Sequence, residues 1–189
     1  MKRDTFIQLY NENQGLIFDS LRKASYIHDC ENHKYGMFDY STHLVEVLSK
    51  VYEYGHDICE NEKDIIILAI SACFHDILED TRTTYNDLKN ILISELLLVR
   101  TVDEISDIVY AVTTPLGKTI EERYCPAYYE KIRNCKFASF IKVADRLANM
   151  KMGAICDLSK LRMYVKEMDK FDIDFSEIPE DMLTELYSY

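Results

Sequence analysis

Residues 65–81 of the chain read IIILAISACFHDILEDT, an apolar run that leads into a polar end. The run is long and almost uninterrupted, which predicts a buried helix. If the helix continues through its polar end, His75 and Glu79 lie one turn apart, and so do Asp76 and Asp80, because side chains at positions i and i+4 share a face. The stretch therefore predicts two neighbouring columns of groups that can bind a metal or move a proton.

These four polar residues allow two interpretations. Unpaired charges are among the most expensive groups to bury in a fold, and a divalent cation would satisfy all four at once. Alternatively, the end of the helix is exposed to water and the four residues are ordinary solvated groups. The rest of the chain favours the first interpretation.

The composition limits the fold and excludes several classes of protein. A length of 189 residues predicts a single domain over residues 1–189. With 48% hydrophobic residues, 5 glycines and 3 prolines, the chain is too apolar for disorder and too poor in turn formers for an all-β fold. Its formal charge of −11 argues against non-specific binding to nucleic acid, which needs a basic surface.

The cysteines and the first residues bear on the location of the protein. The six cysteines form no CxxC pair, and the start, MKRDTFIQLY, lacks the apolar core of a signal peptide. No uncharged apolar run is long enough to span a bilayer. We therefore expect a cytoplasmic protein with reduced thiols that binds neither nucleic acid nor membrane. The oligomeric state is left open.

Apolar residues recur at helical spacing along most of the remaining chain, and no segment predicts a convincing strand. Helices are expected at residues 4–23, 40–54, 85–99, 102–112, 137–152 and 158–171, with a short last helix that starts near residue 179. Helix caps are predicted at Asn61, Thr84, Thr101, Thr119 and Asp157. Residues 24–39 are predicted to form a polar loop, and residues 118–136 a partly irregular segment that Pro126 interrupts. The pattern predicts an all-α helical bundle.

A divalent ion at His75 and Asp76 needs further ligands from elsewhere in the chain. His43 and Asp145 are the candidates, because each interrupts the apolar side of a predicted helix. Taken singly, a buried histidine is more often a satisfied core residue, and Asp145 could simply pair with a neighbouring lysine or arginine. The same His-Asp dipeptide also begins at His28 and at residue 56, and both of these are predicted to lie at the surface.

The order of the candidate ligands, H…HD…D, resembles the HD superfamily of metal-dependent phosphohydrolases. Residues 75–88, HDILEDTRTTYNDL, and 141–150, IKVADRLANM, resemble the HDxxEDTxTT and KLADRLxNM segments of the Rel/Spo alarmone hydrolases. Residues 40–47, YSTHLVEV, are similar to the segment that carries the first histidine of that family, and residues 109–113, VYAVT, to its VxxVT run. The resemblance covers about residues 25–155 and leaves residues 156–189 as C-terminal helices.

The resemblance implies a role for each matching residue. It implies one Mn²⁺ per chain, bound by His43, His75, Asp76 and Asp145, and a catalytic acidic pair, Glu79 and Asp80. Two imidazoles and two carboxylates with open positions for water also suit Mn²⁺ better than a thiolate-rich zinc site. The positions that match nucleotide-binding residues are Lys34, Tyr40, Lys142, Arg146 and Asn149. Arg146 could instead simply pair with a carboxylate, such as Glu79 or Asp80.

The implied function is that of a small alarmone hydrolase with an all-α HD-domain bundle. Such an enzyme removes the 3′-pyrophosphate of ppGpp or pppGpp and gives GDP or GTP and pyrophosphate. The chain departs from the family at Asp39, where proline is common in a loop that helps to hold the guanine base, and at Ala148 and Met152. Two alternatives are a hydrolase of another nucleotide, for example a 3′- or 2′-phosphorylated nucleotide cofactor such as NADPH, and a nucleotide-binding protein without catalysis.

Overall fold

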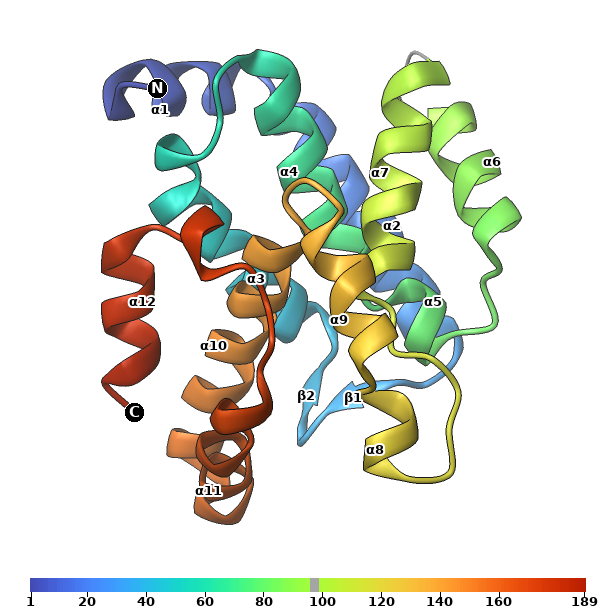
Figure 1. Cartoon of the computed structure of the whole chain (residues 1–189). Helices are drawn as coiled ribbons and strands as arrows, with labels where there is room; N and C mark the ends of the chain where they lie inside the picture. The colour runs from blue at the N-terminus through green and yellow to red at the C-terminus, as the bar shows by residue number, and fades with distance from the viewer. Residues whose placement is uncertain (96–98) are drawn as a thin grey trace.

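The helices of this protein, seen in a computed structural model that describes residues 1–95 and 99–189, form a bundle around one central helix (Figure 1). The first half of the chain forms α1 (Arg3–Glu12), α2 (Gln14–Cys30), β1 (Lys34–Tyr35), β2 (Phe38–Asp39), α3 (Ser41–Tyr54), η1 (Gly55–Asp57), α4 (Glu62–Phe74), α5 (Ile77–Asp80) and α6 (Tyr85–Glu95). The second half forms α7 (Val99–Val112), α8 (Ile120–Arg123), α9 (Pro126–Arg133), α10 (Ala138–Cys156), α11 (Leu158–Glu167), η2 (Met168–Lys170), η3 (Phe175–Glu177) and α12 (Glu180–Tyr187).

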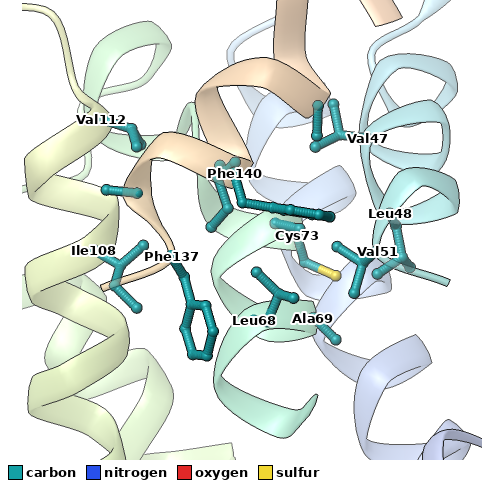
Figure 2. Packing of buried hydrophobic residues seen from close by; sticks show 14 of the residues in the cluster. Val47, Leu48, Val51, Leu68, Ala69, Cys73, Ile108, Val112, Phe137 and Phe140 are labelled. Carbon is teal, nitrogen blue, oxygen red and sulfur yellow. The ribbon is translucent and has the colours of Figure 1, made fainter. Parts of the chain in front are cut away.

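Helix α4 is the centre of the bundle. Nearly all of its residues are buried, because α1, α2, α3 and α7 pack around it and α10 also contacts it. In Figure 2, Leu68 and Cys73 of α4 lie between Val51 of α3 on one side and Ile108 of α7 on the other, with Phe140 of α10 across them. The all-α bundle predicted from the sequence is confirmed, and its core lies where the apolar run predicted it.

The central stretch is two helices rather than one. Helix α4 ends at Phe74, residues 75 and 76 form a corner, and α5 follows. The imidazole of His75 donates from Nδ1 to the carbonyl of Ala72 at 2.8 Å. A side chain therefore binds a backbone carbonyl of the last turn of α4. Yet the amide of Asp80 still donates to the carbonyl of Asp76 at 2.9 Å. The expected continuous helix is therefore wrong, although Asp76 and Asp80 still lie one turn apart.

Residues 24–39 differ from the expected loop. Helix α2 continues to Cys30, because Ala24 and His28 extend its buried side and are fully covered. A turn then leads into an antiparallel hairpin in which Lys34 pairs with Asp39 and Tyr35 with Phe38. At its tip Gly36 has φ +63°, a left-handed conformation that glycine adopts without strain. The prediction of no strand is also wrong, although this hairpin is small.

Most of the predicted helix caps are confirmed. The side chain of Asn61 accepts a hydrogen bond from the amide of Asp64 at 3.0 Å, and Thr84 and Asp87 bind each other's amides reciprocally. Asp157 caps α11 in the predicted way. Thr101 does not cap a helix, since α7 already begins at Val99. The helix expected at residues 85–99 is α6 up to Glu95, and its remainder includes residues 96–98, which lie outside the described part of the chain.

The remaining boundaries follow the sequence more loosely. Within residues 118–136 the chain forms two short helices, α8 and α9, and Pro126 occupies the first turn of α9, where its missing amide costs nothing. Thr119 caps α8, as expected, by accepting from the amide of Glu122 at 3.2 Å. The predicted helix at 4–23 is divided at Asn13, and α11 ends at Glu167 rather than at residue 171. None of the described helices is both long and apolar enough to cross a membrane.

Candidate active site

Four side chains from three parts of the bundle meet at one point. His43 comes from the first turn of α3, His75 and Asp76 from the corner between α4 and α5, and Asp145 from the middle of α10. One ligand atom from each of these residues lies within 4.8 Å of all the others. The sequence predicted these four residues as a set, and the fold brings all of them together.

The two imidazoles are oriented toward the carboxylates. Because Nδ1 of His75 donates to the carbonyl of Ala72, its Nε2 presents a lone pair to the cluster. This Nε2 lies 3.2 Å from Nε2 of His43 and 2.8 Å from a carboxylate oxygen of Asp76. Lone pairs and negative oxygens at such distances repel one another unless a positive charge lies among them. The donor set therefore fits a divalent cation.

The electrostatics of the cluster agree with this interpretation. Burial would lower the pKa of His43, but its hydrogen bonds with Asp145 and Asp76 outweigh burial and raise the pKa to about 9. Burial would likewise raise the pKa of Asp145, and the charge of Lys142 together with His43 brings it below its usual range instead. The buried cluster thus favours a cation, whether a proton or a metal ion.

Asp145 is held in place from two sides. Lys142 donates from Nζ to one of its carboxylate oxygens at 3.2 Å, and Asn149 donates from Nδ2 to the other at 2.5 Å. Asn149 in turn accepts from the hydroxyl of Tyr35 at 3.2 Å. Lys142 and Asn149, which were predicted from the sequence as nucleotide contacts, both orient a candidate metal ligand in this structure.

The acidic pair lies beside the cluster. Glu79 accepts from the amide of Thr114 at 2.9 Å, and burial raises its pKa above the ordinary value of 4.5. Asp80 accepts from the hydroxyl of Tyr40 at 3.0 Å, and burial also raises its pKa. The same hydroxyl is 2.5 Å from Asp76, so Tyr40 joins a candidate metal ligand to the acidic pair. A carboxyl group with a raised pKa is suited to proton transfer near neutral pH.

All of these groups surround one cavity of about 280 Å³. Of the residues predicted from the sequence, it is lined by Lys34, Tyr40, His43, Asp76, Glu79, Asp80, Lys142, Asp145, Arg146 and Asn149. His75 reaches the cluster from behind the cavity wall. A larger groove of about 680 Å³ runs between α4, α7 and residues 131–137, but it contains none of these groups.

Two cations of the cavity have carboxylate partners outside the metal cluster. Lys34 pairs across the hairpin with Asp39 at 2.6 Å, and Arg146 pairs with Glu167 at 3.0 Å. Arg146 thus pairs with a carboxylate, as the alternative expected, but its partner is Glu167 rather than Glu79 or Asp80. Its guanidinium also lies 4.8 Å from the ring centre of Tyr164. The ring of Tyr164 and the carboxylate of Glu167, the last residue of α11, therefore fix it in place.

Several residues of the cavity were not predicted from the sequence. They are His33, Tyr35, Gly36, Tyr124, Lys160 and Tyr164. Lys160 and Tyr164 share a face of α11, a helix whose apolar residues are at most partly buried, so its apolar periodicity did not indicate that it approaches the site. His28 was predicted to lie at the surface, yet its ring is fully buried and stacks on Tyr40 at 4.2 Å. Most of the residues that follow it in the sequence are polar, so the apolar pattern did not indicate that His28 is buried.

A second hollow of about 220 Å³ adjoins the cavity. It lies between the hairpin and the corner from α10 to α11, and it shares Tyr35, Gly36, Asn149, Lys160 and Tyr164 with the first. The side chains of Phe38 and Met152 contribute apolar surface to it. Together the two hollows are large enough to hold a ligand bigger than a phosphate group.

An all-α bundle that gathers two histidines and two aspartates from separate helices has the architecture of a metal-dependent phosphohydrolase. The HD domain family model matches residues 40–150, more than half of the chain, and the chain belongs to this family. No curated protein matches the sequence significantly. The fold is similar to a solved structure described as a metazoan ortholog of SpoT that hydrolyzes ppGpp and plays a role in starvation responses. That match has a TM-score of 0.63 and 17% sequence identity, and it covers 91% of this chain and 92% of the other.

Proposed function

We propose that this protein is a Mn²⁺-dependent hydrolase of ppGpp and pppGpp that releases pyrophosphate from the 3′ position. The observation that carries the proposal is the meeting of His43, His75, Asp76 and Asp145 beside an acidic pair in one cavity. The motif of the acidic pair, HDILEDT, and the segment IKVADRLANM support the Rel/Spo type within the HD family. The fold of the SpoT-like structure is in accord with this choice.

The four clustered residues would hold the cation, and the other groups would act on the substrate. When bound, the cation lowers the pKa of a coordinated water and neutralises charge on phosphoryl oxygens. Glu79, fixed by the amide of Thr114, accepts the proton of the attacking water. Asp80, fixed by Tyr40, holds the water or supplies the proton of the leaving group.

The remaining cavity residues would bind the nucleotide. Lys142 and Arg146 contribute positive charge next to the cluster, where the transferred phosphates must lie. Lys160 and Tyr164 lie at the boundary of the two hollows, between the cluster and the apolar surface of Phe38 and Met152. This second hollow suits a base or a sugar, so a nucleotide rather than a bare phosphate ester is the proposed substrate.

One contact favours a second candidate within the same reaction class. Asp39 stands where the Rel/Spo family commonly has proline, and it binds Lys34 at 2.6 Å. The ion pair reduces the positive charge that this lysine offers to a substrate. A 3′- or 2′-phosphorylated nucleotide cofactor, such as NADPH, is therefore the alternative substrate.

The test is to load the purified protein with Mn²⁺, add ppGpp and identify the products. GDP and an equal amount of pyrophosphate are expected. The variant Glu79→Gln serves as the control, since it should bind Mn²⁺ without forming these products. If ppGpp stays intact while Mn²⁺ is bound, the proposal is wrong. Release of phosphate from NADPH in the same assay would then support the second candidate.

A further inference from the structure

The ring of Tyr40 packs against two histidine rings that the site described above does not use. His28 stacks on it with the ring centres 4.2 Å apart and the planes inclined by 26°. His33 stacks on it at 4.0 Å and 24°, beside His28, since the ring centres of the two histidines are only 5.3 Å apart. Tyr40 is almost fully buried, and its hydroxyl binds the carboxylates of Asp76 and Asp80. The two histidines thus pack side by side against the residue that joins both carboxylates.

The two histidines also bind each other. Their Nδ1 atoms are 3.1 Å apart, so one of them donates a proton and the other accepts it. On its far side, Nε2 of His33 lies 3.8 Å from a carboxylate oxygen of Asp80. A chain of contacts therefore runs from buried His28 through His33, which lines the cavity, to a member of the acidic pair.

The direction in which the hydrogen bonds of this chain are donated follows from the position of the proton on His28. Burial lowers the pKa of His28 to about 4, so its ring is neutral at neutral pH and carries one proton. If that proton is on Nδ1, His33 accepts it and carries its own proton on Nε2, directed at Asp80. In the opposite arrangement a lone pair of His33 would face the carboxylate. The proton of His28 would then be on Nε2, a buried atom without a hydrogen-bond partner among the described residues.

We propose that His33 is a positioning residue for Asp80, and that His28 fixes the tautomer in which Nε2–H of His33 is directed at that carboxylate. Together with the hydroxyl of Tyr40, this N–H faces Asp80 across 3.8 Å, and its attraction favours one orientation of the carboxylate at the cavity wall. The inference rests on the proposed function, because Asp80 acts on the attacking water or the leaving group there. Neither histidine belongs to the motifs that define the family match.

Two variants test the two ring nitrogens of His33 separately. The amide nitrogen of His33→Gln replaces Nε2 and can still donate to Asp80, whereas that of His33→Asn replaces Nδ1 and cannot reach it. With Mn²⁺ and ppGpp, kcat of His33→Asn should fall roughly tenfold with little change in KM, in the range typical of residues that orient an active-site ligand. His33→Gln should recover most of the loss. If kcat of His33→Asn equals that of the wild-type protein, the proposal is overturned.

A double-mutant cycle distinguishes positioning from a general structural role. In an Asp80→Asn background, His33→Asn should cause no further loss of kcat, because the carboxylate that it positions is absent. If the two losses multiply instead, His33 acts independently of Asp80 and the proposal is wrong.

The tautomer can be measured without any substrate. Long-range ¹H–¹⁵N correlations of the histidine rings, recorded slightly above neutral pH, should show His28 protonated at Nδ1 and His33 at Nε2. The reverse pattern would overturn the proposal. If the unchanged protein leaves ppGpp intact, the proposed function fails, and these spectra still decide whether the His28 to His33 pair has the required tautomer.

Discussion

At the scale of single residues, Glu79 is the group on which the proposed chemistry depends most. Its carboxylate accepts from the amide of Thr114 and does not belong to the metal cluster. Glu79→Gln keeps the shape and one acceptor oxygen, so Mn²⁺ should remain bound. Turnover of ppGpp should fall about 10²- to 10⁴-fold, the loss typical of removing a general acid or base. Steady-state kinetics with metal analysis check this, and Glu12→Gln in α1 is the matched control. A nearly normal rate would show that the carboxylate is structural.

Asn149 carries a different prediction. Its hydrogen bond to Asp145, 2.5 Å long, orients a candidate metal ligand, so Asn149→Ala should weaken Mn²⁺ binding about 10- to 100-fold. Calorimetric titration with Mn²⁺ measures the change. Lys151→Ala, at an exposed position of the same helix, controls for a general effect on α10 and should leave the affinity unchanged. If Asn149→Ala binds Mn²⁺ normally but needs more nucleotide, its role is that of a nucleotide contact.

His28 predicts a dependence of stability on pH. Burial lowers its pKa in the folded protein to about 4 from an ordinary value of 6.5. Between these values the unfolded chain takes up the proton first, so the contribution of His28 is complete above pH 6.5 and is lost as the pH falls toward 4. The loss should be on the order of 3 kcal/mol of unfolding free energy. Urea titrations from pH 4 to 7 on the unchanged protein and on His28→Asn compare the slopes, and identical slopes would contradict the prediction.

At the scale of elements, the C-terminal helix α12 is anchored to α3 by a half-buried ion pair. Lys50 is only 7% exposed, and its Nζ lies 2.7 Å from Glu185, which also accepts from Tyr54 at 2.8 Å. Removing this carboxylate leaves Lys50 with only Glu53, an exposed partner at 3.1 Å.

Glu185→Gln should therefore lower the unfolding free energy by about 2 kcal/mol, because a buried charge loses its main partner. Denaturant titration measures the loss. Asp19→Asn breaks the exposed pair with Arg22 and should cost less than about 0.5 kcal/mol. If the two variants are equally stable, α12 is not anchored by this contact.

The elements also show what could be predicted from the sequence. Apolar periodicity located α3 and α10, an uninterrupted apolar run located α4, and side-chain caps located the starts of α4, α6 and α11. Each of these signals lies within its own segment and can be read from the sequence of that segment alone. The corner at His75 was missed because the apolar pattern does not show that the ring binds the carbonyl of Ala72 in the preceding turn. The burial of His28 was missed because it depends on a distant element, the tyrosine ring at the start of α3.

The site was predictable to the extent that its residues interrupt apolar helices. His43 and Asp145 stand out because each is a polar group on a buried side. Lys160 and Tyr164 gave no such signal, since α11 has no fully buried residue and only its packing on α10 brings them to the cavity. The ion pairs of Lys34 and Arg146 likewise depend on partners that adjoin them only in the folded chain.

At the scale of the whole molecule, the bundle works as a frame that brings distant segments to one point. Residue 43, the adjacent residues 75 and 76, and residue 145 are far apart along the chain, and they meet because α3 and α10 both pack against α4 and against each other (Figure 1). The core around Leu68 and Phe140 fixes the spacing of these helices. Well-packed interiors resist deformation, so the ligand geometry should be largely preformed.

The most direct test of this account is anomalous diffraction from a crystal of the protein soaked in Mn²⁺. The account predicts one anomalous peak per chain, within bonding distance of Nε2 of His43 and His75 and of the carboxylates of Asp76 and Asp145. A crystal with bound Mn²⁺ at other residues, or with no peak among these four, would contradict the central claim that they form the metal site of a phosphohydrolase.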